Sequence, residues 1–321
     1  MARQRRAGRR GADKAGETGA TSVGPRERGG EPNHRVDGSK RPAPGLYVVA
    51  TPIGNMEDVT LRALALLRGA DVVACEDTRV TAKLLARHGI SCALVAYHDH
   101  NAERVRPLLL ERLRGGQTVA LVSDAGTPLV SDPGFKLVRE AIALGLPVTT
   151  LPGASAPLAA LVLSGLPSDR FLFGGFLPAK AVARRRALAE LAAVPATLIF
   201  FEGAPRLAAA LGDMAETLGD RPAAVARELT KLHEEVRRGA LAELAAHYET
   251  AGPPRGEVVV VVAPPAKDVA APTADALDTQ LMAALDAMSI RDASAAVASA
   301  TGLPRRDVYA RALALRGEEG K

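Results

Sequence analysis

From residue 45 onward, short runs of apolar residues alternate with stretches in which apolar residues recur at helical spacing. The runs are rich in Val, Leu and Ala, which is typical of buried strands. Because strand, loop and helix follow one another with short connections, the pattern predicts an α/β domain with a largely parallel sheet over residues 45–165. The expected strands are 46–50, 71–75, 93–97, 118–122 and 147–151.

Cap and stop residues mark the helices of this domain. Asp58 can cap a helix whose apolar face is Leu61, Leu64 and Leu67, and Gly69 ends it. A second helix carries Leu84 and Leu85 and is stopped by Gly89. The remaining helices are expected at 102–114, at 135–144 and up to Ser164.

A second α/β unit follows a short linker, Gly165-Leu-Pro-Ser168, and is expected over residues 168–265. Its strands and helices alternate as in the first domain, so we expect a sheet covered by helices here too. The expected strands are 171–176, 197–201, 223–226 and 257–262, and the helices lie near 180–193, 205–218 and 240–250.

A second linker, 266–274, leads to a small helical module at 275–316. Ser289-Ile-Arg-Asp292 is typical of a capping box at a helix start. Two short helices around a Gly turn resemble a helix-turn-helix, and a helical packing appendage is the alternative. The residues expected to face inward are Leu277, Leu281, Leu285, Met288, Ala293, Val297, Val308, Ala312 and Leu315, and the arginines expected outside are Arg305, Arg306, Arg311 and Arg316.

Composition limits the class of protein. Apolar residues make up 47% of the 321 residues and aromatic residues only 3%, so we expect a core of Ala, Leu and Val. No apolar run is long enough to span a bilayer, and the N-terminus lacks the apolar segment of a signal peptide. Cys75 and Cys92 have no metal-ligand spacing. These features predict a reduced cytosolic protein without a bound metal.

The charge is unevenly distributed. Residues 1–41 contain 11 Lys and Arg against 5 Asp and Glu, whereas the whole chain carries only +5. Residues 1–44 have almost no large apolar side chains, so we expect a disordered basic tail. It is either a solvated extension or a flexible arm that touches RNA phosphates. The high isoelectric point reflects this tail, so it does not show that the folded domains bind nucleic acid.

Polar loops follow most of the predicted strands. The sequence contains no zinc-binding pattern, phosphate loop, nucleophile elbow or dinucleotide fingerprint. Since ligands bind beyond the carboxyl ends of strands in α/β sheets, we expect these loops to converge on one cleft between the two domains. The loops are Thr51–Asn55, Glu76–Arg79, Ser123–Gly134, Pro152–Ser155, Phe201–Arg206 and Ala226–Lys231.

These loops also carry a family resemblance. In order, they read Thr51-Pro-Ile-Gly-Asn-Met-Glu-Asp58, Cys75-Glu-Asp-Thr-Arg79, Ser123-Asp-Ala-Gly-Thr-Pro-Leu-Val-Ser-Asp-Pro-Gly134, Pro152-Gly-Ala-Ser155, Phe200-Phe-Glu-Gly203 and Ala226-Arg-Glu-Leu-Thr-Lys231. Together they resemble the ribosomal RNA methyltransferase branch of the tetrapyrrole methylase superfamily over residues 45–316. Porphyrin-type members usually begin with Gly-x-Gly-Pro-Gly, and the different loop at 51–55 favours the RNA branch.

The resemblance implies a fold, a reaction and partners. It implies two α/β domains with S-adenosylmethionine between them, usually in a homodimer. The methyl acceptor would be the ribose 2′-hydroxyl of a cytidine in the decoding region of 16S rRNA, either free or in the small ribosomal subunit. The residues that would contact the methyl donor are Pro52, Asp124, Gly126, Thr127, Pro128, Val130, Pro152, Gly153, Ala154, Ser155, Ala156, Ala226, Arg227 and Gly256.

The catalytic set stays open at this point. Methyl transfer needs alignment of oxygen, carbon and sulfur, and removal of a proton from a weakly acidic hydroxyl. Asp77, Glu202 and Lys231 are candidates for the base, and Arg79 can orient the ribose or the RNA backbone. Asp132 and Glu228 are further carboxylates that could act as base. Each of these residues could instead cap a helix or form a salt bridge, and His98 and His100 fit a solvated loop.

Two other classes of function compete with this interpretation. The first is a tetrapyrrole or diphthamide-pathway methylase of the same superfamily. The second is a non-catalytic RNA-binding assembly factor, which would bind RNA but not the methyl donor. The loop at 51–55 and the C-terminal module favour the rRNA methyltransferase.

Overall fold

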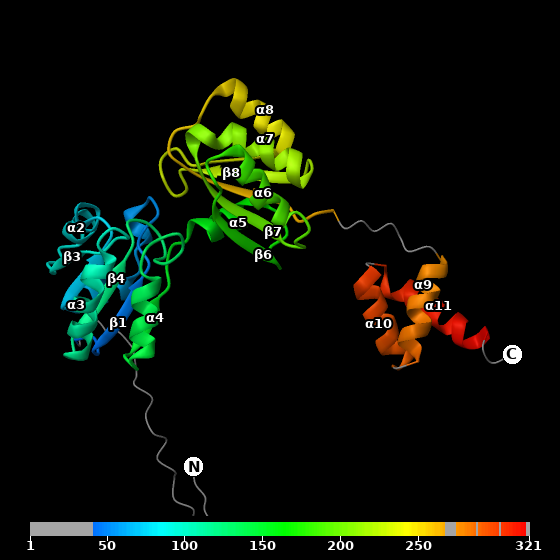
Figure 1. Cartoon of the computed structure of the whole chain (residues 1–321), viewed down its shortest axis with the longest axis horizontal. Helices are drawn as coiled ribbons and strands as arrows, with labels where there is room; N and C mark the ends of the chain where they lie inside the picture. The colour runs from blue at the N-terminus through cyan, green and yellow to red at the C-terminus, as the bar shows by residue number, and fades with distance from the viewer. Residues whose placement is uncertain (1–40, 267–273, 287, 302, 319–321) are drawn as a thin grey trace, which may run out of the picture. The chain divides into compact units, whose positions relative to one another are not determined.

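The computed structural model describes residues 41–266, 274–286, 288–301 and 303–318 (Figure 1). Most of the expected tail (1–44) and of the expected second linker (266–274) therefore lies outside the described residues. The last residues of the expected tail contact the first domain. Arg41 forms an ion pair with Asp71, and Tyr47 Oη donates a hydrogen bond to the Ala43 carbonyl oxygen at 2.9 Å.

The first domain contains a five-stranded sheet in the order β3-β2-β4-β1-β5. Every neighbouring pair is parallel, as the sequence predicts, and Val49 of β1 pairs with Val122 on one side and Leu151 on the other. The carboxyl ends of all five strands consequently lie along one edge. The strands are β1 Gly45–Val49, β2 Val72–Cys75, β3 Leu94–Ala96, β4 Thr118–Val122 and β5 Val148–Leu151.

Apolar side chains pack on both faces of this sheet, in two separate clusters. The cap expected at Asp58 is wrong: Asp58 ends a short 3-10 helix, and Thr60 caps α1 by accepting a hydrogen bond from Ala63 N at 3.1 Å. Leu61 is 85% exposed, so it does not belong to the buried face of α1, contrary to the prediction. The helices are η1 Met56–Asp58, α1 Leu61–Gly69, α2 Thr78–Arg87, α3 Ala102–Arg114, α4 Phe135–Ala143 and α5 Ala156–Ser164.

The second domain has a mixed sheet in the order β6-β7-β10-β8-β9. Strands β7 and β8 both run antiparallel to β10, so their carboxyl ends lie beside the start of β10. From the sequence we expect parallel pairing throughout to bring the polar loops together. In this sheet the loops after β7 and β8 instead lie near one another because both strands pair antiparallel with β10. The strands are β6 Phe171–Phe176, β7 Thr197–Gly203, β8 Pro222–Arg227, β9 Glu235–Ala240 and β10 Glu257–Val262.

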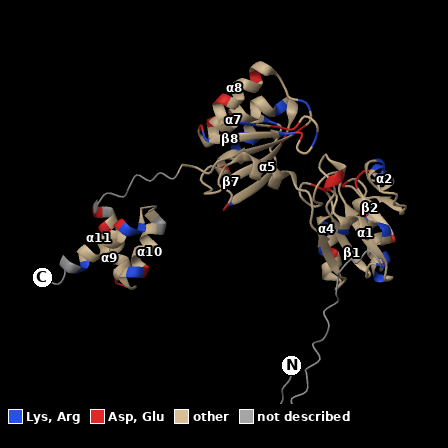
Figure 2. Cartoon of the chain, turned by 180° about the vertical axis from the view of Figure 1, so that it is seen from behind, with Lys and Arg blue, Asp and Glu red and all other residues tan. Residues whose placement is uncertain are grey.

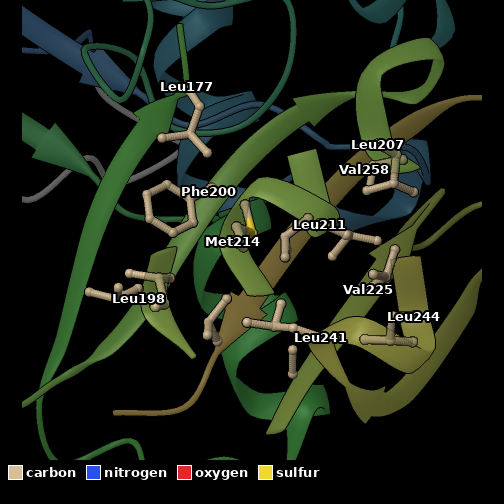
Figure 3. Close-up of a cluster of buried hydrophobic side chains, with 14 of the residues drawn as sticks. Leu177, Leu198, Phe200, Leu207, Leu211, Met214, Val225, Leu241, Leu244 and Val258 are labelled. Carbon is tan, nitrogen blue, oxygen red and sulfur yellow. The ribbon is translucent and has the colours of Figure 1, made fainter. Parts of the chain in front are cut away.

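Strand β9 is absent from the elements that the sequence predicts, because Glu-Val-Arg-Arg-Gly-Ala has few apolar residues. Figure 3 shows the main core of this domain, where Leu198 and Phe200 of β7 pack among leucines and Met214. All three expected helices are present, so the α/β prediction is confirmed. The helices are α6 Ala181–Leu191, η2 Ala204–Arg206, α7 Leu207–Leu218 and α8 Leu241–Ala251.

The C-terminal module consists of α9 Ala274–Leu285, α10 Ile290–Thr301 and α11 Arg305–Glu318. The expected helix start is present: Asp292 N donates to Ser289 Oγ at 3.2 Å, which is one half of a capping box, and Ser289 Oγ donates to Asp292 Oδ2 at 2.7 Å. Two expectations are wrong. Met288 lies beyond α9 and is 47% exposed, and Arg311 is held by Asp278.

The buried residues of this module are Leu281, Leu285, Ala293, Val297, Val308 and Ala312, with Leu277 and Leu315 packed against them. Among the described residues, no helix is both long and apolar enough to cross a membrane.

Candidate active site

Hydrogen bonds join the loops at the carboxyl edge of the first sheet. Thr51 N donates to Gly126 O at 2.9 Å, and Gly126 N donates to Thr51 O at 3.1 Å. Asp77 N donates to Asp124 Oδ1 at 3.0 Å. The loops after β1, β2 and β4 therefore form one connected surface.

The loop after β4, residues 123–134, has an unusual backbone. Leu129 and Ser131 have φ values of +74° and +66°, which side chains other than glycine seldom adopt. Gly134 has a φ of +132°, and a Cβ there would lie 2.7 Å from Leu121 Cδ2. Such strain, of order 1–3 kcal/mol per residue, persists only where the surrounding structure enforces it and is concentrated at functional sites.

The second domain contributes a loop of the same kind after β8. Glu228 and Thr230 have φ values of +49° and +65°. Asn55 N donates to Thr230 Oγ1 at 3.0 Å, so this loop touches the first domain. At Gly256, with φ +91°, a Cβ would lie 2.0 Å from Glu228 Oε1. Only glycine fits there, because the Glu228 side chain occupies the space.

The loops enclose a first cavity of about 370 Å³, lined by residues of both domains. Its apolar lining includes Ile53, Phe176, Phe201 and Leu229. A larger and more open hollow lies beside β3 and α3, away from these loops. Of the residues expected to contact the methyl donor, those that line the first cavity are Asp124, Gly126, Thr127, Val130, Ser155, Ala156 and Gly256.

Other expected donor contacts point elsewhere. Ala226 is fully buried against Ile199 and Val259, and Arg227 turns to Glu235 at 2.8 Å. Pro128 is buried within its loop, whereas Pro152 and Gly153 are exposed. The Ala154 carbonyl accepts a hydrogen bond from Thr127 Oγ1 at 3.1 Å, so its role is to hold the loop after β4. Pro52 lines a neighbouring cavity.

This second cavity has a volume of about 210 Å³. It shares Ile53, Asp124, Ala125 and Glu257 with the first, so the two adjoin. Sequence reasoning does not find its side chains from α2, because an apolar position on a helix gives no sign that it faces a cavity. The lining residues outside the shared four are Thr51, Pro52, Gly54, Met56, Val80, Thr81, Leu84, Ser123 and Lys231.

The catalytic candidates at 77 and 79 pair with each other. Asp77 caps α2, and its Oδ2 lies 2.6 Å from Arg79 Nη2. Hydrogen bonds from the Arg79 side chain and backbone lower the pKa of Asp77 to about 2. Both residues lie outside the linings of the two cavities. Asp77 therefore stays ionised and serves as a helix cap, which is the alternative that the sequence leaves open.

Lys231 lines the second cavity between two carboxylates. Its Nζ lies 2.8 Å from Glu228 Oε1 and 3.0 Å from Glu257 Oε2. Burial acts to lower the pKa of Lys231, but the hydrogen bonds and charges of Glu228 and Glu257 together raise it. The Lys231 hydrogen bond in turn lowers the pKa of Glu228. Lys231 is therefore a poor proton acceptor and a suitable contact for an anion.

Glu202 of β7 lines the first cavity, as does Asp132. Its side chain is fully buried; Oε1 accepts a hydrogen bond from Gly203 N at 2.7 Å and lies 2.5 Å from Arg206 Nη2 in an ion pair. Its Oε2 is buried and has no hydrogen-bond partner among the described residues. Because buried polar atoms are almost always paired, this oxygen indicates a ligand group with a donor.

Several carboxylates gather on the first-domain side, and acidic positions (red) mark these loops near α2 in Figure 2. Burial raises the pKa of Asp132 to about 6, and the charges of Glu76 and Asp124 add to the rise against a Ser123 hydrogen bond. Burial also raises the pKa of Glu76. Among the described residues, no Lys, Arg or His lies within ion-pair distance of Asp124 or Asp132.

The remaining sequence candidates play other parts. The rings of His98 and His100 meet edge to face at 6.0 Å, and neither residue lines the two cavities. The Asn55 side chain accepts a hydrogen bond from Glu57 N at 3.1 Å and so caps η1. In the part of the chain that the structure describes, no group of three or more His, Cys, Asp or Glu residues could hold a metal ion.

Comparisons with solved structures agree with the fold. Diphthine synthase matches with a TM-score of 0.53 and 21% identity, over 68% of this chain and 89% of that one. The cobalamin biosynthetic enzyme cobalt precorrin-4 methyltransferase matches with a TM-score of 0.50 and 19% identity, over 68% and 94%. At these identities the likeness shows the fold alone.

Comparisons of sequence identify the family. Residues 45–245 match the tetrapyrrole (corrin/porphyrin) methylases, and residues 270–316 match the RsmI C-terminal HTH domain. Similar proteins named ribosomal RNA small subunit methyltransferase I occur in Mesorhizobium japonicum (54% identity over 87% of this chain and 94% of the relative) and Pseudomonas aeruginosa (46% over 85% and 98%). The chain therefore belongs to the tetrapyrrole methylase family and ends in an RsmI-type C-terminal helix-turn-helix domain.

Proposed function

We propose that this protein transfers a methyl group from S-adenosylmethionine to the ribose 2′-hydroxyl of a cytidine in the decoding region of 16S rRNA. The observation that carries the proposal is the similarity to rRNA small subunit methyltransferases over most of both chains, C-terminal domain included. A tetrapyrrole or diphthamide-pathway methylase would share the two-domain fold, but neither of these relatives is named as such an enzyme.

The first cavity fits the methyl donor. Its volume lies in the range of small-molecule sites, and Ile53, Phe201 and Leu229 provide apolar surface for an adenine ring. The buried Oε2 of Glu202 offers an acceptor for a hydroxyl or amino group of the donor. Gly126 keeps the backbone open where the ligand approaches, whereas the space at Gly256 is taken by the Glu228 side chain.

The chemistry that the bound donor supplies is a methyl carbon on a positively charged sulfur. The protein has to align that carbon with the acceptor oxygen and accept the hydroxyl proton. Ion pairing makes Asp77, Glu228 and Lys231 poor bases. Asp124 and Asp132 line the first cavity without a cation partner among the described residues, so we propose that one of them accepts the proton.

Arg79 and Lys231 are proposed to contact RNA phosphates. The Arg79 side chain is 86% exposed at the start of α2, and Lys231 lies beside the second cavity. Both are already paired with carboxylates, so each would share its charge with the RNA. Their loss should weaken RNA binding more than donor binding.

We also propose a homodimer in the cytoplasm. Apolar side chains on α4 and α5 are exposed: Phe135 is 62%, Ile142 61% and Val162 79% exposed. Such surfaces are typical of subunit contacts. The free thiols of Cys75 and Cys92 are consistent with a reducing compartment. Light scattering of the full chain tests the dimer, and a monomer at micromolar concentration would contradict it.

One experiment tests the main proposal. The protein is incubated with S-adenosylmethionine labelled in its methyl group and with undermodified small subunits, free 16S rRNA or a tetrapyrrole, and the product is mapped by mass spectrometry. We expect label on a single cytidine ribose of the rRNA. Label on the tetrapyrrole, or an RNA complex that forms without any methyl transfer, would overturn the proposal.

A further inference from the structure

The second cavity adjoins the first, which the proposed function assigns to the donor. The two share Ile53, Asp124, Ala125 and Glu257 in their linings. A group bound in the second cavity would therefore lie next to whatever occupies the first. This is the arrangement that a two-substrate transfer requires, since the reacting atoms have to come within about 3–3.5 Å.

The lining of the second cavity suits one flat ring. Met56 of η1 and Val80 and Leu84 of α2 provide apolar contacts, together with Pro52. The polar side chain of Thr51 is already committed, because its Oγ1 donates to Ser123 O at 3.1 Å. At about 210 Å³ the cavity lies below the usual 300–1,000 Å³ of sites for drug-sized ligands, a size that suits a single nucleobase.

A charged group lies at the same cavity. The Lys231 ammonium is held by Glu228 and Glu257, and its stem passes close to Gly54, where a Cβ would lie 2.5 Å from Lys231 Cγ. The close approach fixes the position of this cation relative to the loop after β1. The Lys231 ammonium is already shared by two carboxylates, but it can still donate a hydrogen bond to an acceptor atom of a base whose ring lies in the cavity.

We propose that the second cavity binds the base of the acceptor nucleotide, drawn out of the RNA structure, and so places its ribose at Asp124 and Glu257 beside the first cavity. The proposal rests on the proposed function and specifies how that function selects its acceptor. Enzymes that modify a base within a folded nucleic acid extrude it into such a pocket, and the same displacement would bring the ribose of the acceptor beside the donor. A base in contact with Met56 and Val80, which both line this cavity, would also limit the acceptor by size.

The proposal is tested by a substitution that fills the second cavity with a large side chain. In Val80→Trp the indole would occupy the space of the base, and Val80 is only half-buried, so the fold tolerates the change. We expect kcat/KM with undermodified small subunits to fall about a hundredfold, because the ribose is misplaced. The affinity for S-adenosylmethionine, measured by calorimetry, should stay within about twofold of the wild type. Met56→Trp makes the same test from a second lining residue, which belongs to η1 and not to α2.

Ala82→Trp is the matched control, since Ala82 is exposed on the same helix and lies outside the cavity lining. It should methylate the subunits like the wild type. Normal transfer by both Val80→Trp and Met56→Trp would overturn the inference while leaving the proposed function intact. Loss of donor affinity in both would also overturn it, because the two cavities would then form one donor site. A wild type that methylates no RNA would instead refute the proposed function.

Discussion

Two loops close on the first cavity from opposite domains, and they differ in charge more than in shape. The loop after β4 holds Leu129 and Ser131 in left-handed conformations, and the loop after β8 holds Glu228 and Thr230 in the same way. In the second domain the carboxylates of Glu228 and Glu257 are paired with Lys231. In the first domain Asp132 lies near Glu76 and Asp124, and among the described residues neither Asp124 nor Asp132 forms an ion pair.

This difference indicates a division of labour. An ion pair restrains two side chains and keeps both charged, which suits a loop that positions a substrate. Buried carboxylates without a partner destabilise the fold and hold their protons more tightly, which suits groups that exchange protons. The strained backbone is therefore common to both loops, whereas unpaired charge is confined to the first.

The largest expected effect is on donor affinity, when a large side chain replaces Gly126 in the loop after β4. In Gly126→Trp, whose wild-type φ is +82° and whose Cβ would lie 3.3 Å from Ile53 Cγ2, the side chain would fill the first cavity. We expect the calorimetric affinity for S-adenosylmethionine to fall more than about a hundredfold. Gly212→Trp is the control, because Gly212 is exposed in α7 and a Cβ there meets nothing. Equal affinity in the two variants would remove the first cavity as the donor site.

The next prediction concerns the unpaired charge of Asp132. Its pKa rises from 3.8 to about 6 on folding, so the folded state binds this proton more tightly than the unfolded chain. The stabilisation from that proton is therefore complete below about pH 4 and is lost as the pH rises through about 6. Asp132→Asn should accordingly raise the free energy of unfolding at about pH 7.5 by about 2 kcal/mol, allowing for partial solvent contact.

The measurement is denaturant unfolding of wild type and Asp132→Asn at about pH 4 and about pH 7.5. The gain should be absent at the lower pH, where the wild-type carboxyl is already neutral. A gain of equal size at both pH values would mean that hydrogen bonding, not charge, explains the effect. If Asp132→Asn instead lowered the free energy of unfolding at the higher pH, Asp132 would have a cationic partner in solution. The two loops would then not differ in charge pairing.

A smaller effect is expected at Asp124. Asp124→Ala removes the acceptor of the Asp77 N–H and loosens the contact between the loops after β2 and β4. We expect donor affinity to fall about tenfold, the cost of a lost hydrogen bond to a charged group. Asp124→Asn keeps an oxygen at the same place and should retain most of the affinity. Identical calorimetric affinities for these two variants would show that the hydrogen bond does not organise the donor site.

The smallest effect is expected outside the two domains. Residues 1–40 carry ten Lys and Arg against five Asp and Glu. Their deletion should lower the affinity for rRNA to about one third and reduce its salt dependence. Donor affinity should not change. Filter binding at two salt concentrations measures the first effect, and a collapse of donor binding on truncation would show that this segment belongs to the active site.

Local sequence is sufficient to predict the elements of the first domain and the loops that carry its chemistry. Short apolar runs such as Thr118–Val122 identify buried strands locally, and the polar loop after each strand falls at the ligand-binding edge because parallel strands share a direction. The Ser289 capping box is likewise a local signal, since it depends on side chains only three residues apart. Motifs in several loops together then indicate the family.

The second sheet and the details of the site depend instead on contacts between distant parts of the chain. Strand β9 is polar and exists because it pairs with β8. Ala226 faces the core although its neighbours in sequence suggest a donor contact, because a strand buried on both faces has no polar alternation to show its orientation. The pKa of Asp132 depends on Glu76, 56 positions away in the sequence. The division of the expected cleft into two cavities depends on packing between loops distant in sequence, and no local pattern encodes such packing.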